Sequence, residues 1–162
     1  MGIAAFRERL VCRSQSGFTL VELVVVLILV GILAAVAIPR LVGIGSYDTR
    51  GFYDRVASGL RYAQKQAIAK RRIVCVNFAA ASVTFTFEPT AGVGCTANLA
   101  GPSGQSPYTV VPQGSGIAFT SAPTNFSFDA LGRPSTGQVI SITGDGTRTL
   151  RVEPETGYVR TS

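Results

Sequence analysis

Residues 18–38, FTLVELVVVLILVGILAAVAI, decide the fold of this chain. The stretch is about 21 residues long with one charged side chain, Glu22, so as a helix it can cross the ~30 Å hydrocarbon core of a bilayer. From residue 40 onward the sequence is rich in Gly, Ser, Thr and Pro, as is ordinary for an extramembrane domain. The sequence therefore predicts a small membrane-anchored protein whose working domain lies outside the bilayer.

The formal net charge of +6 is concentrated after the apolar stretch. Between residues 40 and 72 there are eight basic residues and two acidic ones, whereas residues 73–162 hold four basic and five acidic residues. A basic segment beside an apolar stretch is more often a solvated helix face or a contact for anionic lipid than a nucleic-acid site. We therefore favour a membrane partner over nucleic acid.

The three cysteines are Cys12, Cys75 and Cys95. Cys12 precedes the apolar stretch, and the other two are about twenty residues apart, which in an exported domain indicates a disulfide that closes a loop. A two-cysteine metal site is the alternative, but the chain has no His and no Cys-x-x-Cys spacing to complete it. The lack of His also excludes Ser-His-Asp and Cys-His catalysis, so we expect no metal, no cofactor and no enzymatic activity.

Three interpretations of residues 1–38 are open at this point. Ala35-Val36-Ala37 has the small-x-small pattern of a signal-peptidase site. However, the apolar stretch exceeds the about 7–15 residues usual in a secretory signal, and Glu22 in hydrocarbon costs about 2.5–3.5 kcal/mol. The second interpretation is a plain membrane anchor, and the third is a leader followed by a helix that uses Glu22 for assembly.

The motif Gly17-Phe18-Thr19-Leu20-Val21-Glu22-Leu23, with Ala37-Ile38-Pro39 ending the apolar stretch, resembles the cleavage and methylation signature of type IV pilins and type II secretion pseudopilins. The resemblance implies a leader peptide at residues 1–17, cleavage between Gly17 and Phe18 by a prepilin peptidase, and N-methylation of Phe18. It also implies that Glu22 and Thr19 serve filament assembly. The implied partners are other pilin or pseudopilin subunits and an inner-membrane assembly platform.

Glu22 has a physical role in such a filament. Cleavage creates an α-amine on Phe18 in an apolar environment, and Glu22 is the only opposite charge in the stretch. The amine of one subunit can pair with the carboxylate of its neighbour, which satisfies two groups that are each costly in lipid. Basic residues flank the stretch about equally, so a single-pass inner-membrane protein with a periplasmic C-terminal domain is implied by the resemblance and by the Cys75/Cys95 pair.

Residues 39–72 are expected to continue the helix beyond a transmembrane segment at residues 18–38. Pro39 removes a backbone donor and should kink the helix. Apolar residues then recur at helical spacing, which predicts an amphipathic helix that packs on the following sheet. These residues are Phe52, Val56, Leu60, Ala63 and Ala67.

Residues 73–162 change to a period of two, which predicts a β-rich head domain. The expected strands are residues 73–78, 82–87, 108–111, 125–128, 139–143, 149–153 and 157–160. Asp145 lies between two glycines, which favours an Asp-Gly hairpin turn over a calcium ligand. We expect an α+β fold in which a long N-terminal helix packs on a C-terminal antiparallel β-sheet.

Three further motifs resemble the H-type minor pseudopilins of the GspH/FimT family. They are Leu60-Arg61-Tyr62-Ala63-Gln64-Lys65-Gln66-Ala67, Phe128-Asp129-Ala130-Leu131-Gly132-Arg133-Pro134 and Thr156-Gly157-Tyr158-Val159. The resemblance implies a minor structural subunit of a type II secretion pseudopilus or of a type IV pilus. One branch of the family binds DNA during uptake through a Gly-Arg-x-Arg tail, where this chain has Gly157-Tyr158-Val159-Arg160 with a single Arg. A DNA-binding uptake subunit is therefore the alternative function.

Overall fold

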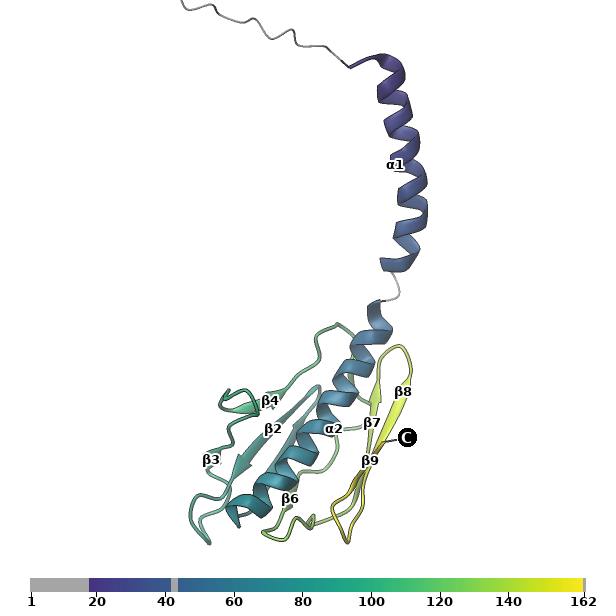
Figure 1. Cartoon of the computed structure of the whole chain (residues 1–162). Helices are drawn as coiled ribbons and strands as arrows, with labels where there is room; N and C mark the ends of the chain where they lie inside the picture. The colour runs from purple at the N-terminus through teal and green to yellow at the C-terminus, as the bar shows by residue number, and fades with distance from the viewer. Residues whose placement is uncertain (1–17, 42–43, 162) are drawn as a thin grey trace, which may run out of the picture. The chain divides into compact units, whose positions relative to one another are not determined.

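The computed structural model describes residues 18–41 and 44–161 of the 162-residue chain (Figure 1). The chain forms two compact units, one ending at Leu41 and the other beginning at Val42. Helix α1 (Leu20–Leu41) belongs to the first unit. Helix α2 (Ile44–Lys70) and strands β1 to β9 form the second unit, which we call the head.

Helix α1 contains the apolar stretch from residue 20 onward and begins directly after Thr19. Its large apolar side chains from Leu20 to Leu33 are exposed on all sides of the helix. A helix that is apolar all round is stable where another apolar surface covers it. Judged by length and hydropathy together, no helix within residues 18–41 and 44–161 qualifies as a membrane span.

Helix α2 buries the apolar stripe that its sequence spacing predicts, because all five stripe residues are fully buried. The helix ends at Lys70, slightly before the predicted end near residue 72. The N–H of Arg72 donates to the carbonyl of Ala67, and the N–H of Arg71 donates to the carbonyl of Ile68, each at 3.2 Å. These two bonds form a Schellman cap, in which Arg71 takes the left-handed position with a φ of 50°.

Two antiparallel sheets complete the head. The first contains β1 (Val74–Ala79), β2 (Ser82–Phe87), β3 (Ala97–Asn98), β4 (Tyr108–Val110) and β6 (Phe126–Phe128). Its order is β3-β2-β1-β6, and β4 also pairs with β2. The second contains β5 (Ala118–Phe119), β7 (Gln138–Thr143), β8 (Thr147–Val152) and β9 (Val159–Thr161), in the order β5-β7-β8-β9.

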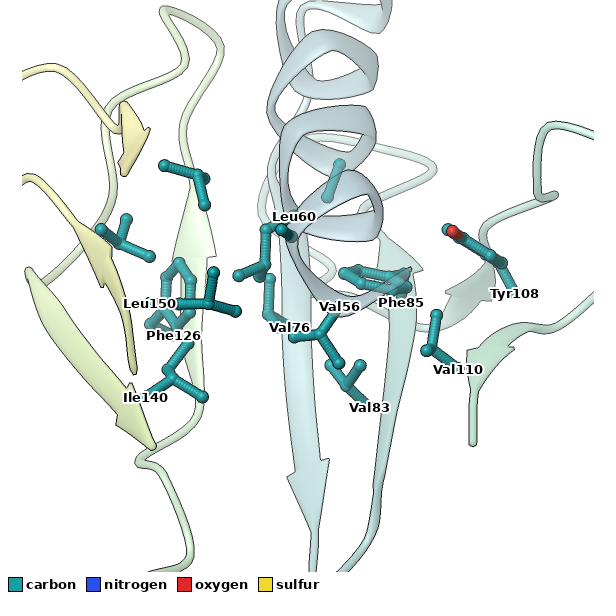
Figure 2. Packing of buried hydrophobic residues seen from close by; sticks show 14 of the residues in the cluster. Val56, Leu60, Val76, Val83, Phe85, Tyr108, Val110, Phe126, Ile140 and Leu150 are labelled. Carbon is teal, nitrogen blue, oxygen red and sulfur yellow. The ribbon is translucent and has the colours of Figure 1, made fainter. Parts of the chain in front are cut away.

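Helix α2 and both sheets share one hydrophobic core (Figure 2). Figure 2 shows Val56 and Leu60 of α2 between side chains of the two sheets. The first sheet contributes Val76 and Phe85, and the second contributes Leu150, all three fully buried. The predicted α+β class, with a helix packed on antiparallel β-structure, is confirmed.

The seven predicted strands correspond to β1, β2, β4, β6, β7, β8 and β9, with ends displaced by no more than about two residues. The predicted Asp-Gly turn at Asp145 joins β7 to β8, where Thr143 pairs with Thr147. The sequence did not predict β3 and β5, which are two residues long each. It also did not predict that the strands divide into two sheets.

Candidate assembly segment and head motifs

The residues expected to serve assembly lie at the start of α1. The N–H of Glu22 donates to Thr19 Oγ1 at 3.2 Å, and the N–H of Leu23 donates to the Thr19 carbonyl at 3.2 Å. Thr19 is therefore the N-cap of α1, and Glu22 stands at the third helical position, as in a capping box. An acid in the first turn also offsets the positive end of the helix dipole. These local interactions show that Thr19 and Glu22 help to start helix α1.

Phe18 precedes this cap and is 82% exposed. Gly17, on the other side of the expected cleavage, lies outside the described residues. Across residues 18–41 and 44–161 the ion pairs are Arg50–Asp54 and Arg151–Glu153, so Glu22 has no cationic partner within that part of the chain. The pairing of Glu22 with a neighbouring subunit stays a prediction, as does the kink at Pro39, which lies within α1.

The expected disulfide joins Cys75 to Cys95, with the two sulfur atoms 2.03 Å apart and the two Cα atoms 6.1 Å apart. Cys75 lies in β1 between the buried residues Val74 and Val76. Because side chains alternate along a strand, Cys75 points away from the core. The bond therefore fastens the loop after β2 to the outer side of the first sheet.

The same loop is held by a carboxylate that sequence reasoning missed. Glu88, directly after β2, is buried, and its Oε1 accepts the N–H of Gly92 at 2.6 Å and of Gly94 at 3.4 Å. Both glycines have positive φ angles, 85° and 81°. A buried carboxylate needs donors that replace its water, and these backbone groups supply them. In the sequence, the only sign of this carboxylate-held loop is an acidic residue followed closely by two glycines.

The three motifs that carry the second resemblance meet at one place in the head. Gln64 of α2 donates from Nε2 to the carbonyl of Gly132 at 3.0 Å and to the carbonyl of Thr156 at 2.8 Å. One turn earlier, Arg61 donates to the carbonyl of Val159 at 3.0 Å. We call this meeting of α2, the loop after β6 and the β8–β9 loop the Gln64 junction.

Loop shape at the Gln64 junction depends on one aspartate and two glycines. Asp129 Oδ1 accepts the N–H groups of Leu131 and Arg133, both at 2.8 Å, which closes the loop after β6. Gly132 and Gly157 both have positive φ angles, and a Cβ on Gly157 would collide with the carbonyl oxygen of Gly132. Only glycine permits this approach. The motifs are thus explained by packing of the head.

The head has an open groove of about 460 Å³ between α2 and the segment leading into β4. Arg55, Ser103 and Tyr108 are among its lining residues. Burial raises the pKa of the Tyr108 phenol above its ordinary value, and the neighbouring Tyr62 adds to the rise. The Tyr62 ring meets Tyr108 edge-on with centroids 5.6 Å apart, so both rings chiefly serve packing.

Metal-ligating side chains do not gather in the part of the chain that the structure describes, where no three His, Cys, Asp or Glu residues form a group. Asp145, considered as a calcium ligand, lies in the β7–β8 turn. Its N–H donates to Thr49 Oγ1 at 3.4 Å. The turn is thereby attached to the first part of α2.

Two family models match the sequence. The model of the prokaryotic N-terminal methylation motif matches residues 12–38, and that of type II transport protein GspH matches residues 53–156. The first match spans the expected cleavage site and the apolar stretch, and the second spans most of the head. A search of curated proteins finds no match.

Among solved structures, the chain is similar to the type IV minor pilin FimU of Pseudomonas aeruginosa strain PAO1 in two crystal forms. The first form has a TM-score of 0.54 and 16% identity, with 72% of this chain and 90% of FimU covered. The second has a TM-score of 0.49 and 16% identity, with 70% and 91% covered. The first match shows the fold that the two chains share, a helix packed on antiparallel sheets.

Proposed function

We propose that this chain, which belongs to the family of type II transport protein GspH, works by being built into a filament rather than by turning over a substrate. The chain is a structural subunit of the minor pilin or pseudopilin type. Its family and fold are those of structural subunits, not of enzymes. The DNA-uptake alternative is not favoured by these matches. The observation that carries the proposal is the pairing of a methylation motif with a GspH head in one chain.

We propose that residues 1–17 are a leader that a prepilin peptidase removes on the cytoplasmic side. The cut falls between Gly17 and Phe18, and the new terminal Phe18 is then N-methylated. The methylation motif at residues 12–38 supports this, because it covers both sides of the cut. The exposure of Phe18 next to the α1 cap is consistent with access by the enzyme.

Residues 18–38 are proposed to anchor the subunit and to pack against other subunits. Residues 39–72 would form the extramembrane half of the stem. Residues 73–162 would complete the head. The exposed apolar side chains of α1 support an anchoring and packing role. Glu22, whose backbone N–H donates to Thr19 Oγ1, would present its carboxylate to the amine of a neighbouring Phe18. Each subunit would then neutralise one costly charge of the next.

The matched motif and fold are those of a membrane-anchored pilin-type subunit. We propose single-pass insertion in the inner membrane with the head in the periplasm, followed by extraction into a type II secretion pseudopilus or a type IV pilus. The Cys75–Cys95 bond supports the periplasm, because disulfides persist in oxidising compartments. The partners would be other pilin-type subunits, the prepilin peptidase and the inner-membrane assembly platform.

Replacing the carboxylate at position 22 tests the proposal. Glu22→Leu removes the charge that pairs with the neighbouring amine, so we expect the subunit to be cleaved but to fall about tenfold or more in the sheared filament fraction. Asp145→Asn, which removes an acid from the β7–β8 turn, is the matched control and should leave incorporation unchanged. Wild-type incorporation of the Glu22→Leu chain would refute the role of Glu22 in assembly.

A further inference from the structure

The Gln64 junction carries a group of apolar side chains that the fold leaves uncovered. Ile68, Leu131 and Tyr158 are 48%, 70% and 61% exposed, respectively. Scattered single apolar residues are normal on a protein surface. These three differ because they come from three segments that the Gln64 junction brings together: α2, the loop after β6, and the β8–β9 loop.

Printed contacts place the three segments against one another. A Cβ on Gly132 would lie 2.7 Å from Ile68 Cδ1, so Ile68 rests on the backbone that follows Leu131. Gly157, which precedes Tyr158, approaches the carbonyl of Gly132. Tyr158 directly precedes β9, and its high exposure shows that its side chain faces solvent. Figure 1 shows these loops beside the C-terminal end of α2.

Two cations flank the apolar side chains. Lys65 is one helical turn before Ile68 on the same side of α2, and Arg133 follows Gly132; both are exposed. Neither belongs to the Arg50–Asp54 or Arg151–Glu153 pairs, the ion pairs found in residues 18–41 and 44–161. We define the Ile68 patch as Lys65, Ile68, Leu131, Arg133 and Tyr158.

The position of the Ile68 patch separates it from the charges that follow the apolar stretch in sequence. Lys65 lies about 31 Å along the axis of α2 from Ile44, given the rise of an α-helix. The basic residues of α2 are therefore spread along the helix from Arg50 to Lys70 and do not gather at its start.

We propose that the Ile68 patch is a docking surface for an acidic, apolar-bearing segment of a different pilin-type subunit. The inference rests on the proposed function and names the chemistry of one partner. Apolar side chains at the centre and unpaired cations beside them match the common arrangement of a protein interface, and cations select an acidic partner. The patch is rigid because Gln64 bonds both of its loops to α2.

Charge also argues against a second copy and against nucleic acid. From residue 18 to 162 the sequence has twelve Lys and Arg and eight Asp and Glu, so two copies repel each other. Nucleic-acid affinity depends on several phosphate contacts, about 6–10 in tight complexes, and this patch offers two cations around an apolar centre. A protein partner with its own apolar side chains fits better.

Site-specific crosslinking in the native host tests the proposal with the full chain. A photo-crosslinking phenylalanine analogue replaces Leu131 in one strain and Val93, an apolar loop residue with 57% exposure, in the control strain. We expect Leu131 to capture a different pilin-type subunit several-fold more than Val93 does, through a peptide that contains Asp or Glu. Capture of a second copy, lipid or nucleic acid, or capture no greater than at Val93, would overturn the proposal.

Charge reversal supplies the second arm. Lys65→Glu with Arg133→Glu should lower the Leu131 crosslink about tenfold or more, since the acidic partner then meets like charge. Arg50→Glu with Arg148→Glu changes the net charge equally outside the patch and should preserve the crosslink. An unchanged yield in the patch variant would contradict the proposal. The proposed function is tested separately, by the mass of the mature chain that begins at Phe18 and by the amount of the chain in the filament fraction. If both are as expected but the crosslinks are not, the docking proposal fails and the proposed function stands.

Discussion

Arg71 occupies a backbone position that favours glycine. With a φ of 50° at the end of α2, its Cβ crowds the backbone, which costs about 1–2 kcal/mol in the left-handed region. The Schellman bonds to Ala67 and Ile68 nevertheless hold it there. Sequence patterning could not locate this residue, because three basic residues in succession give no sign of where the helix stops.

Arg71→Gly should stabilise the head. Relief of the left-handed strain exceeds the about 0.5–1 kcal/mol of extra chain entropy that glycine loses on folding, which leaves a gain of about 0.5–1 kcal/mol. Denaturant unfolding of the purified chain in detergent, followed by near-ultraviolet tyrosine circular dichroism, measures this. Arg72→Gly is the control, because Arg72 has no positive φ angle, and it should not stabilise. A lower unfolding midpoint for Arg71→Gly would contradict the strain argument.

Gln64 is a second residue whose role only the fold reveals. Its amide faces two carbonyl oxygens, those of Gly132 and Thr156, so Gln64→Ala should cost about 1–3 kcal/mol for two lost hydrogen bonds. Gln64→Glu should cost more at neutral pH, since a carboxylate would face the same two oxygens. The free energy of unfolding checks both. Gln66→Glu, at a neighbouring position of α2, is the control and should change stability by a few tenths of a kcal/mol.

At the scale of elements, the periodicity of apolar residues predicted the long helix and the long strands correctly. The buried stripe of α2 and the alternation in β1, β2, β7 and β8 follow from side-chain direction alone. Strands β3 and β5 are too short for a period to be visible, and they exist because β2 and β7 offer free edges. Division into two sheets depends on how the strands wrap around α2, which no local pattern encodes.

The loop after β2 is an element whose order depends on the Cys75–Cys95 bond and on Glu88. The two cysteines are 20 positions apart in the sequence, so loss of the bond should lower stability by about 3 kcal/mol through a freer unfolded chain. Cys75→Ser with Cys95→Ser, compared with wild type by denaturant unfolding, measures the change. Cys12→Ser is the control and should have no effect, because the proposed leader carries Cys12. Equal midpoints for the double variant and wild type would rule out a stabilising role.

At the scale of the whole molecule, the two units of the chain present different kinds of surface. Helix α1 presents exposed apolar side chains and one acid, the composition expected of a segment that packs into a filament. The head presents a rigid surface assembled around Gln64. The N-terminal motif could be identified from the sequence because its residues are contiguous, whereas the Ile68 patch could not, since its members come from three distant segments.

The mass of the mature protein, purified from the native host, tests the central claim most directly. We expect a chain that begins at Phe18, carries one added methyl group at its amino terminus, and has no free thiol because Cys75 and Cys95 are bonded. A chain that begins at Ile38 would mean that signal peptidase had cut after Ala35-Val36-Ala37, and a chain that begins at Met1 would mean that no leader is removed. Either result would contradict the assignment of this chain as a processed filament subunit.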